Sequence, residues 1–183
     1  MLCISKNKAV LAAGVVAFAG IATLAWAAQD RYTLKALNGI SFAEIKGYDT
    51  WPTVSVSQVE DGIKVIVGNP ALIAAYKSGI PNNGKPFPDG VKFVKIEWSQ
   101  KKNPESPYYV MVPDKLMSVT LIEKDSKRFP DTSGWGYAQF LYDTKTKSFK
   151  SFGVNKSFGK DICYSCHTAV AKKDYIFTAY SER

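Results

Sequence analysis

The run of residues 91–98 reads Val91-Lys92-Phe93-Val94-Lys95-Ile96-Glu97-Trp98. It is rich in β-branched and aromatic side chains and follows a glycine, which predicts a β-strand. Because successive side chains of a strand point to opposite faces, Lys95 shares one face with Val91 and Phe93.

Similar runs lie on both sides of this strand. Strands are predicted over residues 63–67, 108–112, 116–122, 135–142 and 149–154. Polar turns over residues 101–107 and 143–147 and a loop over residues 128–130 separate them. Adjacent strands with short connections favour an antiparallel sheet.

Two helix signals precede these later strands. Ser41 and Glu44 form a capping box that predicts a short helix to about Thr50. Asn69 and Pro70 begin a second helix, over residues 71–77, which a glycine ends. We therefore expect an α+β fold: an antiparallel sheet, a few short helices and a C-terminal segment that carries the motif described below.

The first residues are typical of a secretory signal peptide. Lys6 and Lys8 precede an apolar run over residues 9–25, which closes with Ala25-Trp26-Ala27. A retained membrane anchor is the alternative, but the run is rich in Ala and Gly and ends in a cleavage-like tripeptide. Cys3 lies ahead of the apolar run, whereas the cysteine of a lipid anchor follows one. We expect a signal peptide at residues 1–27, one domain at residues 28–183 and a periplasmic location.

The composition suits one domain with a large apolar ligand. The chain has 183 residues, 46% hydrophobic and 13% aromatic, which excludes a disordered chain. Loss of residues 1–27 removes two of the eight excess positive charges. The remaining lysines are scattered, so we expect a solvated basic surface and neither a nucleic-acid site nor, after cleavage, membrane contact. Binding of an acidic redox partner to this basic surface is an alternative that the sequence leaves open.

Residues 163–167 carry the chemistry of the chain and read Cys163-Tyr164-Ser165-Cys166-His167. This is the C-x-x-C-H pattern of haem c attachment. Two thiols about one helical turn apart can each form a thioether with a haem vinyl group. The adjoining imidazole then lies under the iron, so we expect one covalently attached haem c with His167 as its ligand.

Other functions of paired cysteines fit less well. A thioredoxin-like pair needs no histidine after its second cysteine, and a zinc site needs two further Cys or His ligands. After signal removal the chain has no other cysteine, and it has no other histidine at all. A disulfide between Cys163 and Cys166 would leave the lone histidine unexplained.

The lone histidine also limits what can bind the far side of the iron. With His167 on one side, ligation by two histidines is excluded. Met111 and Met117 are the remaining strong ligands, but both lie in predicted strands, where methionine is more often core filler. We therefore expect an open or water-occupied position, which favours binding or catalysis over simple electron transfer.

Several stretches together resemble the cytochrome P-460 family. They are Ala75-Tyr76-Lys77-Ser78-Gly79, Phe87-Pro88-Asp89-Gly90 with Val94-Lys95, Lys127-Arg128-Phe129-Pro130 with Gly134-Trp135, and the haem motif followed by Asp174-Tyr175-Ile176-Phe177-Thr178. The resemblance implies an antiparallel β protein, a homodimer, and a five-coordinate haem c. Members of the family oxidise hydroxylamine, and the related cytochromes c-prime-beta bind nitric oxide without that activity.

The resemblance also gives Lys95 a role. It matches the lysine that the family's enzymes link covalently to the haem ring, and its place on an apolar strand face fits, because an unpaired buried ammonium is costly. The alternative is that Lys95 extends its charged end to solvent.

Two positions depart from the enzymes. Ala169 lies where they carry a carboxylate, and Lys64 replaces their distal arginine. Hydroxylamine oxidation releases protons and needs a base, for which Glu97, Asp89 or Asp174 could substitute. The expected function is redox chemistry on hydroxylamine or nitric oxide, with electrons passed to a periplasmic cytochrome. The alternatives are a non-catalytic nitric oxide binder and a plain electron carrier.

Overall fold

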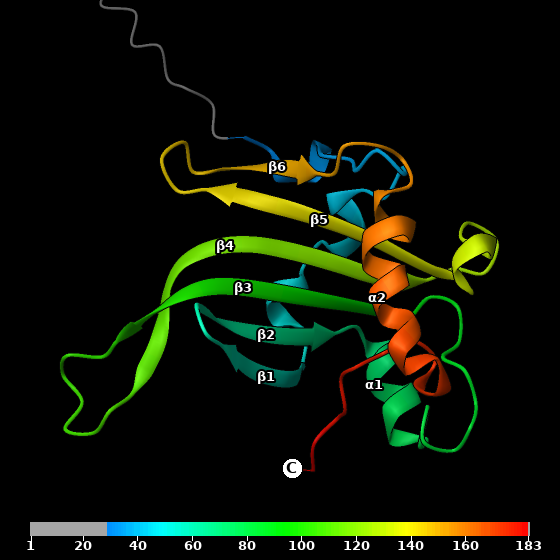
Figure 1. Ribbon diagram of the computed structural model, residues 1–183, viewed down its shortest axis with the longest axis horizontal. Coiled ribbons are helices and arrows are strands. Elements are labelled where there is room, and N and C mark those ends of the chain that lie inside the picture. Colours follow the sequence, from blue (N-terminus) through cyan, green and yellow to red (C-terminus); the bar gives the residue numbers. More distant parts are fainter. Residues whose placement is uncertain (1–28, 183) are drawn as a thin grey trace, which may run out of the picture.

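The computed structural model describes residues 29–182, which form one six-stranded antiparallel sheet whose strands lie in chain order (Figure 1). The strands are β1 (Thr53–Val59), β2 (Gly62–Gly68), β3 (Lys92–Lys102), β4 (Met111–Lys124), β5 (Trp135–Asp143) and β6 (Ser148–Phe152). The helices are α1 (Pro70–Lys77) and the single turn α2 (Ser165–His167). The α+β class predicted from the sequence is confirmed. The expected signal peptide, residues 1–27, lies outside the described residues.

Shorter helical turns complete the structure. Those of 3-10 type are Arg31–Thr33, Phe42–Ile45, Tyr48–Thr50, Pro130–Thr132 and Thr168–Lys173, and a π-helical turn spans Gly159–Tyr164. Among residues 29–182, no helix is long and apolar enough to cross a membrane.

The strand predictions were wrong in two places. β1 was not predicted, because its alternating serines gave it little apolar character. Residues 108–112 and 116–122 belong to one strand, β4, which begins only at Met111. The pairing of β3 with β4 shifts on both sides of Trp98, so the two strands stay together past Pro113. Irregular pairing of this kind accommodates a residue that cannot donate to the ladder.

The first predicted helix is replaced by two 3-10 turns. Its capping box is present: the Ser41 hydroxyl accepts from the Ala43 amide at 3.2 Å, and the Glu44 carboxylate accepts from the Ser41 amide at 2.9 Å. Gly47 then takes a φ of 83°, a left-handed conformation that interrupts a right-handed helix. The helix α1 forms as predicted, with the Asn69 side chain accepting from the Leu72 amide.

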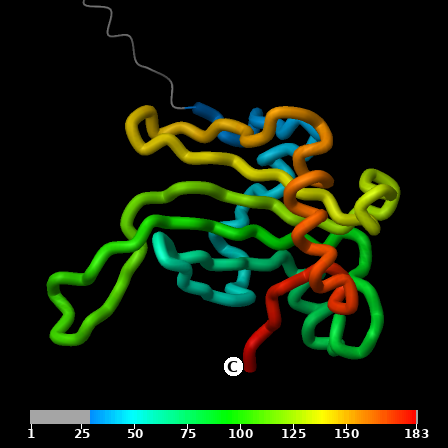
Figure 2. Tube along the Cα trace, viewed as in Figure 1, coloured from blue at the N-terminus to red at the C-terminus, as the bar shows by residue number. Residues whose placement is uncertain are grey.

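The two faces of the sheet are covered by opposite ends of the chain. On one face, Val94, Leu121 and Phe140 pack against Phe42 and Ile45 of the N-terminal turns. Each such side chain contributes about 1.5–3 kcal/mol when fully buried. Figure 2 shows the N-terminal segment, blue to cyan, on one side of the sheet, and the C-terminal segment, orange to red, crossing the other.

The second face carries α1 and the C-terminal segment. Leu72 of α1 comes so close to the sheet that a Cβ at Gly68 would lie 2.5 Å from its Cδ2 atom, so β2 needs glycine there. Phe93 and Trp135 pack here with Ile176 of the C-terminal segment. This packing fixes the segment that follows Cys163 and His167 against the sheet.

Candidate functional site

The Cys163 to His167 motif lies where the C-terminal segment crosses the sheet, in the π-helical turn and α2. Both cysteines are free thiols; Cys163 is half-buried and Cys166 is exposed. Burial raises the pKa of the Cys163 thiol, and the nearby Lys95 charge acts in the opposite direction. The two thiols and the imidazole of the motif thus lie on continuous helical backbone.

The His167 ring is fixed by one hydrogen bond. Its Nδ1 atom lies 2.5 Å from the Tyr175 carbonyl oxygen. Because a carbonyl can only accept, Nδ1 carries the proton, and Nε2 keeps its lone pair for a metal. The Tyr137 and Phe177 rings flank the imidazole, each with its centroid 5.0 Å away. Burial lowers the pKa of His167, the bond to Tyr175 opposes this shift, and the Lys95 charge adds to it.

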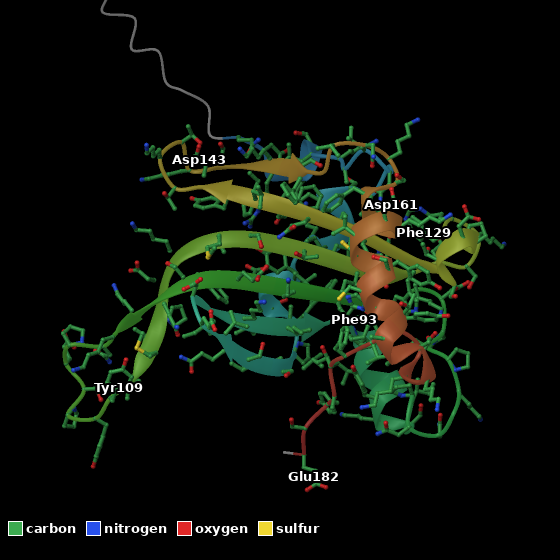
Figure 3. The ribbon with its side chains drawn as sticks, viewed as in Figure 1. Phe93, Tyr109, Phe129, Asp143, Asp161 and Glu182 are labelled. Carbon is green, nitrogen blue, oxygen red and sulfur yellow. The ribbon has the colours of Figure 1, made fainter. Side chains whose placement is uncertain are left out.

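A cavity of about 510 Å³ lies between the sheet and this segment. Its lining comes from all strands except β6 and from the C-terminal segment: Ser55, Ser57, Lys64, Ile66, Phe93, Lys95, Thr120, Ile122, Tyr137, Gln139, Cys163, Cys166, His167, Ile176, Phe177, Thr178 and Ala179. Figure 3 labels Phe93, on β3 beneath the crossing segment. The volume is in the range of cofactor sites, about 300–1,000 Å³.

The sheet wall of the cavity follows the strand register. One row of paired residues crosses five strands, in the order Ser55, Ile66, Lys95, Thr120 and Gln139. The row beside it contains Phe93, Ile122 and Tyr137. Residues two apart on a strand share a face, so both rows point into the same cavity. The wall therefore has an apolar, aromatic end and a polar end.

Two polar atoms of this wall lack partners within the described part of the chain. The Thr120 and Tyr137 hydroxyls are buried, and neither has a hydrogen-bond partner among residues 29–182. Burial raises the pKa of Tyr137 far above its usual range, so this hydroxyl is a neutral donor. Buried polar groups are nearly always paired, so these two hydroxyls are suited to a polar group of a ligand.

Lys95 faces the cavity, as its strand position predicted, but its charge is paired. Its Nζ atom lies 3.0 Å from Glu97 Oε2, and Lys64 Nζ lies 3.3 Å from Glu97 Oε1. Burial acts to raise the pKa of Glu97, but Lys95, the Ser118 hydroxyl and Lys64 together lower it. One carboxylate thus neutralises part of the charge of two lysines on the cavity wall.

The other sequence candidates lie elsewhere. Three of them lie outside the cavity lining: Ala169, Met111 and Met117. Ala169 is exposed, Met111 is partly exposed and Met117 is 49% exposed. Asp89 accepts hydrogen bonds from the backbone and hydroxyl of Ser126. Asp174 is bound to Lys124 and also lies outside the lining. Glu97, by contrast, pairs with Lys64 and Lys95 of the cavity wall.

Sequence reasoning missed the polar and aromatic part of the wall. Thr120, Tyr137 and Gln139 were read only as parts of strands, and Ser55 and Ser57 lie in the strand that was not predicted. The sequence did contain a signal for them. Polar residues recur at every second position of these strands, on a face that would be apolar if it were ordinary core.

The residues present fit a haem c. The motif supplies two thiols at the required spacing and an imidazole whose Nδ1 is held by Tyr175. The cavity adds aromatic walls and two hydroxyls that lack a partner among the described residues. A second cavity, of about 590 Å³, is lined by Arg128, Phe129 and Lys160 among others, and none of its lining residues is a cysteine or histidine.

Comparison with known proteins identifies a family. The family described as Cytochrome P460 matches residues 45–178, which covers most of the chain and ends just past the motif and Tyr175. No curated protein gives a significant match. The chain therefore belongs to the cytochrome P460 family, whose members are c-type haem proteins.

Proposed function

We propose that the protein binds one haem c through thioethers at Cys163 and Cys166, with His167 as the iron ligand. The observation that carries the proposal is the position of His167: its Nδ1 is held by Tyr175, and its ring lines the same cavity as both thiols. The bound haem would supply an iron that exchanges electrons and binds small ligands at its open position.

The proposed reaction is redox chemistry on hydroxylamine or nitric oxide in the periplasm. The cavity lining supports small, largely uncharged ligands, because Phe93, Ile66 and Ile122 are apolar and Glu97 offsets the two lysines. Electrons would pass to a periplasmic cytochrome. A homodimer is part of the proposal, and light scattering of the haem-loaded protein tests it.

One observation favours the non-catalytic alternative, a nitric oxide binder. No carboxylate is among the described residues that line the cavity, and Glu97 is already paired with Lys64 and Lys95. A carboxylate held by two ammonium groups is a weak base, whereas hydroxylamine oxidation needs protons to be removed. A plain electron carrier would need Met111 or Met117, neither of which lines the cavity.

Haem attachment is tested by denaturing electrophoresis of protein matured in a host that makes c-type cytochromes. Haem should remain on the wild-type chain, be lost from Cys163→Ala/Cys166→Ala, and remain on His167→Ala with an altered spectrum. Haem that leaves the denatured wild type would refute the attachment. An unchanged spectrum of matured His167→Ala would remove that residue as the ligand.

Turnover separates the two functions. Hydroxylamine with an artificial electron acceptor should be consumed by an enzyme, whereas a binding protein should give only a nitric oxide complex. A spectrum that shows methionine, and not water, at the sixth position without added ligand would contradict both and indicate an electron carrier.

A further inference from the structure

Asp174 has a largely buried carboxylate outside the cavity, which accepts hydrogen bonds from three separate parts of the chain. Both of its oxygens lie 3.0 Å from Lys124 Nζ at the end of β4. The Trp135 indole donates to Oδ1 at 3.3 Å, and the Phe87 amide donates to Oδ2 at 2.8 Å. The side chains of Asp174 and Lys124 are 10% and 7% exposed. This residue is therefore anchored to β4, β5 and the loop before β3.

The backbone at Asp174 makes an unusual turn. Asp174 and Tyr175 have φ values of 48° and 64°, a left-handed conformation that residues other than glycine seldom adopt, least of all in succession. The turn follows the 3-10 turn Thr168–Lys173, and the Tyr175 amide bonds back to the Val170 carbonyl at 3.1 Å. Conformations of this kind persist only where the surroundings hold them.

The turn places one functional atom. By reversing the chain, it directs the Tyr175 carbonyl to His167 Nδ1, eight residues earlier. The carbonyl belongs to the backbone, so its position depends on what holds the turn. The contacts of Asp174 with Lys124, Trp135 and Phe87 hold the turn against β4, β5 and the loop before β3.

We propose that Asp174 is a positioning residue for the iron ligand, acting through the Tyr175 carbonyl on the orientation and basicity of His167. The inference rests on the proposed ligation of haem iron by His167. A hydrogen bond from the second ring nitrogen makes a histidine a stronger electron donor to its metal. A stronger donor stabilises the ferric state, so Asp174 keeps the reduction potential low. It touches neither the cavity nor the thiols.

The test uses the haem-loaded protein and the variant Asp174→Asn. Its shape is unchanged, but the anchor is weakened because the amide has only one accepting oxygen. We expect the iron–His167 stretching band of the ferrous protein, measured by resonance Raman, to move to lower frequency and broaden, and the midpoint potential to rise. Asp131→Asn is the control: the Asp131 side chain is 77% exposed and pairs with Lys160 at 3.4 Å, so neither quantity should change.

A second variant separates anchoring from charge and guards against misfolding. Asp174→Asn leaves the Lys124 ammonium buried without its partner, which is strongly destabilising. Asp174→Asn/Lys124→Met removes both charges together, so a purely electrostatic effect should cancel, whereas a loss of anchoring should still lower the band frequency.

The outcomes are distinct. If the double variant keeps the wild-type band and potential, the role of Asp174 is refuted. If the wild type itself shows no iron–histidine band, the proposed ligation by His167 fails instead. If Asp131→Asn shifts the potential as far as Asp174→Asn does, the effect is general surface charge and the proposal is overturned.

Discussion

Lys95 shows how a single residue can satisfy two expectations at once. It lies on the face shared by Phe93 and lines the cavity with the motif residues, as a haem-linked lysine should. Lys95 also pairs with Glu97, and its side chain is 28% exposed. The ion pair gives the ammonium group a partner without any bond to haem. The two roles differ in their chemistry and can be told apart.

We predict a bond from Lys95 to the haem ring. The linking nitrogen would perturb the conjugation of the ring and move the ferrous absorption to the red. Lys95→Ala should restore an ordinary c-type spectrum with the haem still attached, and the wild-type haem peptide should carry a second peptide that contains Lys95. Lys64→Ala is the matched control, because Lys64 lines the same cavity and pairs with the same Glu97. Coincident spectra of wild type and Lys95→Ala, with no second peptide, would leave Lys95 as an ion-pair partner only.

The Tyr137 hydroxyl gives a stability prediction that differs between the haem-free and haem-loaded protein. Its buried hydroxyl has no partner within residues 29–182, so Tyr137→Phe should stabilise the Cys163→Ala/Cys166→Ala variant by about 1 kcal/mol in urea unfolding. In the haem-loaded protein the gain should vanish, since the hydroxyl would then have a polar partner. Tyr164→Phe, which removes a hydroxyl bonded to Ser133 at 2.8 Å, should stabilise neither form. An equal gain in both forms would mean that the Tyr137 hydroxyl has no partner on haem.

At the scale of elements, one carboxylate of the N-terminal turns forms ion pairs with β3 and with the loop after β4. Glu44 caps its own turn and also contacts Lys92 of β3 at 3.3 Å and Arg128 at 2.9 Å. Burial acts to raise its pKa, but the bonds from Arg128 and the Ser41 amide lower it from 4.5 to about 2. A carboxylate with a lowered pKa stabilises the fold above its unfolded pKa and loses that effect as the pH falls.

We therefore predict a pH-dependent cost for Glu44→Gln. At neutral pH the variant should be less stable by about 1 kcal/mol, as expected for a charged hydrogen bond partly screened by solvent. The difference between the two unfolding free energies should shrink as the pH falls from about 4.5 towards 2. Chemical denaturation across this range measures it, with Asp49→Asn on the neighbouring exposed turn as the control. A difference that stays constant with pH would show that the ionised carboxylate is not what stabilises the turn.

At the scale of the whole molecule, the sheet separates two different tasks. One face is closed by the N-terminal turns around Phe42 and Phe140, and the other holds the cavity under the C-terminal segment. The hairpin between β3 and β4 extends beyond the sheet, and Figure 3 shows Tyr109 near its tip. The motif residues lie near the C-terminus, and they contact a sheet that the preceding strands form.

We predict that the whole chain is exported and that its signal peptide is removed. The mature chain should begin at Ala28, because small residues at Ala25 and Ala27 precede the expected cleavage point. The intact mass of the exported, haem-loaded protein measures both the cleavage and the number of haems. Ala27→Phe should block cleavage and leave the longer chain, whereas Ala28→Ser should process normally. A wild-type mass that includes residues 1–27 would contradict the prediction.

The sequence alone determined those features that depend on neighbours within a few residues. Helical spacing brings the side chains of Cys163, Cys166 and His167 together. The alternation of side chains along a strand decides which face Lys95 occupies. The Ser41 cap depends on a hydrogen bond to a residue two positions away. The tertiary structure alone decided which distant side chains meet. Thr120 and Gln139 join Lys95 because of strand register, and Asp174 reaches Lys124, 50 residues earlier, because the C-terminal segment folds back over the sheet. Register and long-range closure are set by turns, bulges and the packing of the whole core, which no local pattern encodes.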